Sequence, residues 1–219
     1  MFVGHYGPSF AAKRIEASIP LWVLFLAAQF LDVLWAPFVL LGIEKVRIVS
    51  HFTGSNALDL YYMPYTHGLP GALGWSLLAA LLYQLIARPA RARAAWLVGI
   101  VVFSHWMLDL IVHVPDLPLY GNAAKVGFGL WNARVLAFGL EALVLIAGIW
   151  LFLTGRPRHR VRMVIFGIAL VTVQIGSTFL SGPPPSDRAV AVSALTAYAA
   201  FALLAWWAVD RGPAEAGAA

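Results

Sequence analysis

The sequence contains no cysteine among its 219 residues. A disulfide framework is therefore excluded, and so is any metal site built on thiolate ligands. A metal ion bound by this chain would have to use histidine, carboxylate or water as ligands. The redox state of the compartment is left open by the same absence.

Charged residues are also scarce. Asp, Glu, Lys and Arg make up 11% of the chain, whereas hydrophobic residues make up 61%. A soluble domain carries about 25% charged residues, so this composition indicates an integral membrane protein in contact with lipids. The formal net charge of +5 does not indicate a nucleic-acid partner, because the basic residues stand in short clusters between apolar runs. No glycine-rich phosphate loop is present either.

Six apolar runs have about the 20 residues that a helix needs to cross a bilayer. The expected spans are 20–43, 68–87, 94–114, a fourth entered through Trp131 and Asn132 and ending near Thr154, then 161–180 and 189–209. We therefore predict an all-α membrane protein with one domain over residues 1–219. Residues 1–154 would hold the site-bearing helices, 155–209 scaffold helices and 210–219 a tail. The oligomeric state is not indicated.

The basic residues predict the topology. One side of the predicted membrane receives Lys13, Arg14, Arg88, Arg91, Arg93, the arginines of the 156–162 hairpin and Arg211. The opposite side receives Lys45, Arg47, Lys125 and Arg188. Cytoplasmic loops of membrane proteins are enriched in Lys and Arg, so both termini are expected on the cytoplasmic side. The expected location is the inner membrane of the cell.

The third predicted span contains a stripe of ionisable residues. His105, Asp109 and His113 are four residues apart and share one helical face, with Asp116 near the same line. A charge near the bilayer centre costs roughly 2.5–3.5 kcal/mol, so such groups face a bundle interior or water. Two imidazoles and a carboxylate are suited to a metal site or a proton relay. A cluster of interhelical hydrogen bonds that only stabilises the bundle is the alternative.

Two further ionisable residues are expected near the depth of His105, which lies about 16 Å from the cytoplasmic end of its span, and His67 is expected above them. At 1.5 Å per residue, Asp32 lies about 18 Å from the cytoplasmic end of the first span and Glu141 about 15 Å below the outer end of the fourth. His67 opens the second span at the outer face. His5 would be a surface residue unless residues 3–14 form a half-helix inside the bundle, which would raise it about 12 Å above the cytoplasmic surface.

The order of these motifs resembles that of the bacterial inner-membrane proteins described as metal-dependent hydrolases. The likeness covers residues 4–116 and rests on Gly4-His5, Leu31-Asp32, Thr66-His67 and Ser104-His105-x-x-x-Asp109. Two ligand positions of that family are replaced here, by Leu34 and Tyr62. A two-metal site would therefore need His113, Asp116 or Glu141 as a substitute.

The resemblance implies hydrolysis at a divalent ion, expected to be zinc, held by His5, Asp32, His67, His105 and Asp109. Asp109 and Glu141 are the expected catalytic groups, with Glu141 as general base, and His113 and Asp116 are expected behind the ligands or at the entrance. Glu141 is equally suited to an ion pair with Arg134.

The position of the cluster in the outer leaflet favours an amphiphilic substrate that enters from the lipid. The second hypothesis for the whole chain is a small permease that uses the same cluster to move protons or cations.

Overall fold

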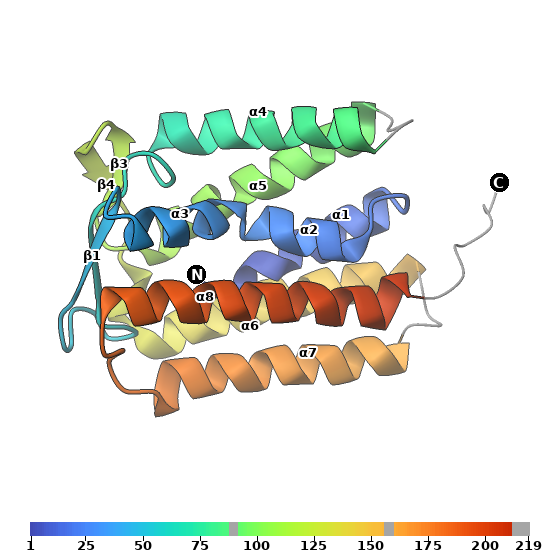
Figure 1. The fold of residues 1–219 in the computed structure, drawn as a ribbon. Coiled ribbons are helices and arrows are strands. Elements are labelled where there is room, and N and C mark those ends of the chain that lie inside the picture. Colours follow the sequence, from blue (N-terminus) through green and yellow to red (C-terminus); the bar gives the residue numbers. More distant parts are fainter. Residues whose placement is uncertain (88–91, 156–159, 212–219) are drawn as a thin grey trace.

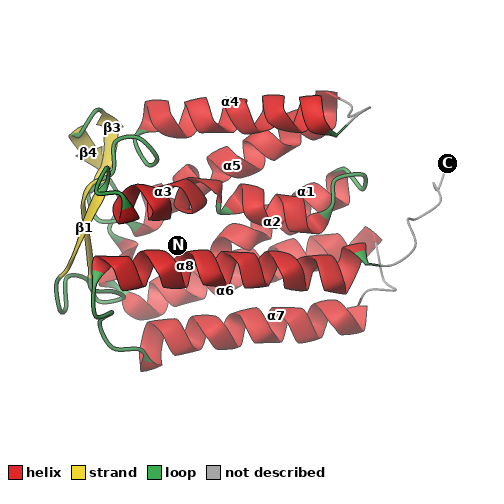
Figure 2. Ribbon diagram, viewed as in Figure 1, coloured by secondary structure: helices red, strands yellow, loops and turns green. Residues whose placement is uncertain are grey.

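The computed structural model describes residues 1–87, 92–155 and 160–211. It is mostly helical, at 69%. The long helices lie side by side, and the strands gather at one end of the helix bundle (Figures 1 and 2). The N-terminus lies in the middle of the bundle (Figure 1). Expected features on Arg88, Arg91, Arg156, Arg158, His159 and the tail from residue 212 onward lie outside the described residues.

The helices follow the order of the apolar runs. They are a 3-10 turn η1 (Val3–His5), α1 (Tyr6–Ile15), α2 (Leu21–Ala28), α3 (Phe30–Leu40), α4 (Leu69–Ile86), α5 (Ala92–Val112), a 3-10 turn η2 (Leu130–Asn132), α6 (Arg134–Gly155), α7 (Arg160–Ile175), a π-helix η4 (Gly176–Leu180), α8 (Asp187–Ala205) and a π-helix η5 (Trp206–Asp210).

Within the described residues, five helical segments are long and apolar enough to cross a membrane. They are α4, α5, α6, α7 with η4, and α8 with η5. The pair α2 and α3 makes a sixth if it counts as one span, although the two helices meet at an angle of 53°. Five or six possible spans agree with the multi-pass membrane protein expected from the composition.

The bend between α2 and α3 falls at Gln29, in the middle of the first predicted span. Gln29 is fully buried and donates from its side chain to the carbonyl of Phe2 at 3.1 Å. Asp32 follows in the first turn of α3. The expected straight first span is thus two helices, and the break lies beside the N-terminal segment.

The connections at one end of the bundle contain two β-hairpins, so the expectation of an all-α fold was wrong there. Strand β1 (Lys45–Ile48) pairs antiparallel with β2 (Leu58–Tyr62), and β3 (Leu117–Tyr120) pairs with β4 (Ala123–Val126). Gly121 supplies a positive φ of 54° at the second turn, a conformation that glycine adopts without strain. These strands are too short to stand out from loops by periodicity alone.

The N-terminal segment forms the half-helix that would bring His5 into the bundle. Helix α1 packs closely on α6. The closeness is evident at two glycines: a Cβ atom on Gly7 would collide with the backbone of Val144, and one on Gly148 would collide with the backbone of Gly7. Small residues allow two helices in a membrane to approach at this distance. His5 is fully buried as a result.

An aromatic core fills the bundle beside this half-helix. Tyr6 stacks on Phe25 with ring centres 4.2 Å apart, and Phe25 stacks on Phe166 at 5.6 Å. Phe10 packs against Phe25 and Phe152. This packing closes the bundle interior between His5 and the end that carries Lys13.

Candidate metal centre

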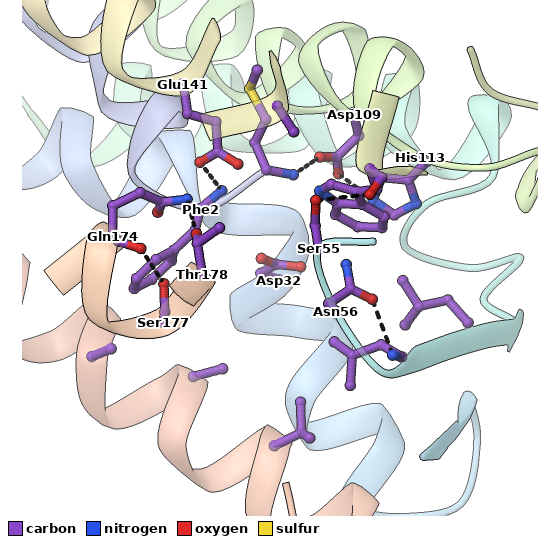
Figure 3. Close-up of a pocket in the computed structure, with 18 of the residues that line it drawn as sticks. Phe2, Asp32, Ser55, Asn56, Asp109, His113, Glu141, Gln174, Ser177 and Thr178 are labelled. Carbon is purple, nitrogen blue, oxygen red and sulfur yellow. Dashed lines mark hydrogen bonds and ion pairs between the residues drawn. The ribbon is translucent and has the colours of Figure 1, made fainter. Parts of the chain in front are cut away.

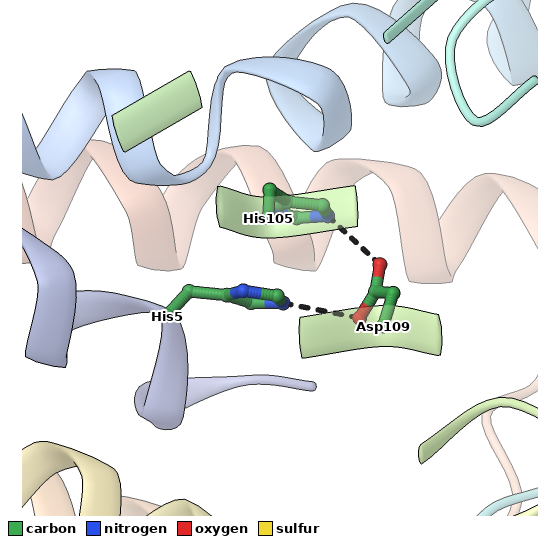
Figure 4. A group of neighbouring side chains, drawn as sticks. All are labelled: His5, His105 and Asp109. Carbon is green, nitrogen blue, oxygen red and sulfur yellow. Dashed lines mark ion pairs between the residues drawn. The ribbon is translucent and has the colours of Figure 1, made fainter. Parts of the chain in front are cut away.

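The structure brings the five residues expected to be metal ligands into one buried cluster. Their ligand atoms form two overlapping groups in which all atoms lie within 4.8 Å of one another. The groups are His5, His105 and Asp109 (Figure 4), and Asp32, His67 and His105. Each group could hold a metal ion, and His105 belongs to both.

Four of these residues surround one small space. Asp109 Oδ2 lies 3.0 Å from His105 Nε2 and 3.8 Å from His67 Nε2. Asp32 Oδ1 lies 3.3 Å from His67 Nε2 and 3.8 Å from His105 Nε2. Ligand atoms bonded tetrahedrally to one zinc ion at about 2.0–2.2 Å are about 3.3–3.6 Å apart, and these four contacts bracket that range.

The ring of His105 is held with Nε2 toward this space. Its Nδ1 lies 2.8 Å from the carbonyl oxygen of Ala28, the last residue of α2. A carbonyl can only accept, so Nδ1 carries a proton and Nε2 is the nitrogen of this ring that is left to bind a metal. Nε2 is buried and faces the carboxylate of Asp109. Such an atom is suited to a metal ion.

His67 is oriented by a hydrogen-bonded chain that includes Glu44. The Thr66 hydroxyl donates to Glu44 Oε2 at 2.6 Å and lies 2.8 Å from His67 Nδ1. With its proton directed to Glu44, this hydroxyl accepts from Nδ1, so Nε2 is the nitrogen that faces Asp32 and Asp109. Glu44 also accepts from the backbone N–H groups of Tyr65 and Thr66, at 2.8 and 2.9 Å.

His113 lies one residue beyond the end of α5 and contacts two carboxylates. Its Nδ1 is 2.8 Å from Asp116 Oδ1, and its Nε2 is 3.5 Å from Asp109 Oδ2. His113 belongs to neither of the two ligand groups. Its contacts place it to hold Asp109 rather than to bind the metal ion.

His5 approaches the other oxygen of Asp109. Its Nε2 is 3.2 Å from Asp109 Oδ1, and its ring stacks on that of His105 with centres 3.8 Å apart. The Met1 amino group lies 2.5 Å from the same Asp109 oxygen. His5 therefore lies at the edge of the four-residue set and contributes through Asp109 or as a further ligand.

Sequence reasoning missed three side chains at this site. Besides Glu44, the hydroxyl of Tyr198 donates to Asp32 Oδ2 at 2.6 Å, and Gln174 lies 3.5 Å from the backbone nitrogen of Val3. Tyr198 and Gln174 belong to the helices expected to be scaffold. The only sequence signal for Gln174 was that a glutamine stands in an apolar helix. No spacing rule links Gln174 or Glu44 to the histidines of the site.

Glu141 lies on the wall of the cavity and contacts the N-terminal segment. Its Oε2 accepts from the backbone N–H groups of Phe2 at 2.8 Å and Gly4 at 3.4 Å. Arg134 instead donates to the carbonyl of Gly54. The alternative ion pair between Glu141 and Arg134 is thus not formed.

A cavity of about 430 Å³ opens beside the cluster (Figure 3). The site carboxylates and imidazoles that line it are Asp32, His67, Asp109, His113 and Glu141. Ligand sites commonly occupy about 300–1,000 Å³, so the space accommodates a small molecule or part of a larger one.

Comparisons of this chain with family models, with curated proteins and with solved structures find no match. The family resemblance carried by the sequence motifs therefore remains a prediction, and function rests on the geometry of the site.

Proposed function

We propose that the protein is a membrane-embedded, metal-dependent hydrolase that acts on an amphiphilic substrate. The observation that carries the proposal is the set of four ligand atoms from Asp32, His67, His105 and Asp109, with neighbouring distances of 3.0–3.8 Å. Both histidines direct Nε2 toward the carboxylates, while each Nδ1 has its own partner in the protein, which is typical of metal-binding histidines. The motif order of the resembling hydrolases supports the same conclusion.

Two imidazoles and two carboxylates suit a divalent ion of the zinc type. A bound ion of this kind lowers the pKa of a coordinated water to about 7 and polarises an oxygen of the substrate. A catalytic site keeps one coordination position open. Asp32, His67 and Asp109 line the cavity and His105 does not, so the open position would face the cavity.

Glu141 is placed to act as the general base. It lies on the same cavity wall as the ligands, and two backbone N–H groups fix one of its oxygens. Tyr198 holds Asp32, while His113 with Asp116 holds Asp109, so both carboxylates are kept in place. Such supporting contacts typically change metal affinity or activity by about 10–100-fold.

We propose a topology of six spans, with α2 and α3 counted as one and with Lys13 and the C-terminus on the cytoplasmic side of a bacterial inner membrane. The expectation of a cytoplasmic N-terminus is corrected, because the Met1 amino group lies inside the bundle against Asp109. Lys13 contacts Asp210 at 3.3 Å, and Arg93 donates to the carbonyl of Ile15, so basic residues from distant segments meet at one end of the bundle. The hairpins at the other end would face outward, with membrane lipids around the helices.

The permease hypothesis has one supporting observation, which is a continuous row of ionisable groups that begins in α5 and continues just beyond its end. His105, Asp109, His113 and Asp116 are joined by distances of 3.0, 3.5 and 2.8 Å. A relay must cross the bilayer, however, and the aromatic core of Tyr6, Phe10, Phe25, Phe152 and Phe166 blocks this row beyond His105. The hydrolase is therefore favoured.

Elemental analysis of the purified protein tests the metal site. Wild type is expected to hold a stoichiometric divalent ion, and His105→Gln to lose it. His51→Ala, which removes an exposed loop histidine, is the control and should keep the ion. Absence of metal from the wild type, together with proton flux in liposomes, would overturn the hydrolase and favour the permease.

A fluorogenic long-chain acyl ester tests the reaction. Hydrolysis is expected with metal-loaded wild type and lost in Glu141→Gln, which should keep its metal because Glu141 does not belong to either ligand group. Equal rates in the two proteins would remove Glu141 from its role as base.

A further inference from the structure

The cavity extends from the metal centre to the membrane-facing surface between α7 and α8. At its inner end Asp109 and His67 are only 2% and 3% exposed. At its outer end the lining residues Val173, Ser177 and Ser193 are all exposed. Val173 and Ser177 belong to α7 and η4, and Ser193 to α8. The cavity therefore reaches the outer surface of the helices between α7 and α8, and Ser55, Asn56 and Leu58 of the β1–β2 hairpin also line it.

The outer part of the cavity combines neutral polar groups with apolar ones. Gln174 donates to the Thr178 hydroxyl at 3.1 Å, and the Ser177 hydroxyl donates to the Gln174 carbonyl at 3.1 Å (Figure 3). Both hydroxyl residues lie in the π-helix η4, a conformation that often occurs at functional sites. Apolar residues of α7 and α8 complete this part: Val173, Val190, Ala194 and Ala197.

The outer part of the cavity lacks the side chains that bind an anionic head group. No Lys or Arg occurs among the described residues that line the cavity. The Met1 amino group is already paired with Asp109. Phosphate sites in proteins typically use Arg or Lys, and hydroxyl and amide side chains instead suit a neutral polar group.

We propose that this cavity binds an uncharged, hydroxyl-bearing acyl ester drawn from the bilayer. The polar head lies among the hydroxyl and amide groups, the ester faces the metal centre, and the acyl chain leaves between α7 and α8. The chain then remains in lipid, so the cavity of about 430 Å³ needs to enclose only the head and the first part of the chain. The position of the ester depends on the proposed hydrolase, whereas binding of the lipid does not.

Photolabelling tests the ligand class and the opening. The probe is a monoacylglycerol with a diazirine in its acyl chain, incorporated into lipid nanodiscs with the full-length protein, and labelled residues are mapped by mass spectrometry. We expect labels on the faces of α7 and α8 that border the cavity. Excess unlabelled monoacylglycerol should prevent labelling, and the corresponding monoacyl phosphate should not.

A matched pair of substitutions in α8 tests the path. Ala194 lines the cavity, whereas Ala200 is exposed on the same helix and does not line it. Ala194→Trp should reduce labelling by roughly tenfold or more, because even one surplus methylene in a pocket changes binding by about 10–200-fold. Ala200→Trp should label like the wild type.

The two proposals fail in different ways. Labelling retained in the metal-free His105→Gln variant, without ester hydrolysis by the wild type, would leave the lipid site standing and remove the hydrolase. Unchanged labelling in a folded Ala194→Trp protein, or competition by the monoacyl phosphate as strong as by the monoacylglycerol, would overturn the lipid site. The competition result decides the ligand class even if Ala194→Trp does not fold.

Discussion

Replacing Thr66 by valine should weaken metal binding without removing a ligand. Thr66 links Glu44 to His67 through contacts of 2.6 and 2.8 Å, and it is fully buried. Valine has nearly the same shape but no hydroxyl, so the backbone contacts of Glu44 to residues 65 and 66 can persist. The imidazole of His67 then loses the acceptor that fixes its proton on Nδ1.

The expected loss follows from the chemistry of that contact. A group that orients a metal-bound histidine typically contributes about 10–100-fold to affinity, which corresponds to about 1.4–2.7 kcal/mol. The buried Glu44 carboxylate keeps two backbone donors, so the protein should remain folded. His67→Gln removes the ligand itself and should lose more affinity than Thr66→Val.

Competition with a chelating zinc indicator in detergent measures this affinity. Thr196→Val is the matched control, because Thr196 is exposed and its hydroxyl contacts only the preceding turn of α8, at Val192. The control should bind like the wild type. Unchanged affinity in Thr66→Val would show that Glu44 and Thr66 do not orient His67, and a loss equal to that of His67→Gln would show that Thr66 acts on more than orientation.

Three shorter predictions follow from other contacts. His113→Gln should keep its metal, with affinity reduced by about 10–100-fold because only a partner of Asp109 is lost; abolished binding in the chelator assay would make His113 a ligand. In the cysteine-free chain, a cysteine introduced at Ser186 should react with an impermeant reagent outside the cell and one at Gly155 should not; the reverse pattern would invert the topology. Gly148→Val should lower the free energy of unfolding by about 1–3 kcal/mol, because the new side chain collides with α1. Gly139 has open space around it, so Gly139→Val should not have this effect. Equal melting temperatures of the two variants would refute the close packing of α1 on α6.

The sequence was sufficient to predict the ionisable cluster, because polar residues in an apolar chain are conspicuous. Helical periodicity placed His105, Asp109 and His113 on one face, and the structure has them in contact. The height of Asp32 above the predicted membrane surface also matched that of His105. These inferences needed only regular helices of known rise.

Features that depend on irregular backbone were not predictable in the same way. The hairpin of β1 and β2 separates Glu44 from Thr66 in the sequence, so no local pattern indicates that their side chains meet. Tyr198 reaches Asp32 across 166 positions. Hairpin pairing and helix breaks are decided by tertiary contacts, which override weak local preferences.

The break at Gln29 shows how one irregularity serves several parts of the site. The last carbonyl groups of a helix have no partner within that helix. Because α2 ends at Ala28, its carbonyl accepts from His105 Nδ1 and leaves Nε2 of that ring free for a metal. Gln29 then holds the N-terminal segment through Phe2, and the new helix carries Asp32 into the cluster within its first turn. A straight helix would lose the first of these contacts, so the metal centre and the bend of the first span depend on each other.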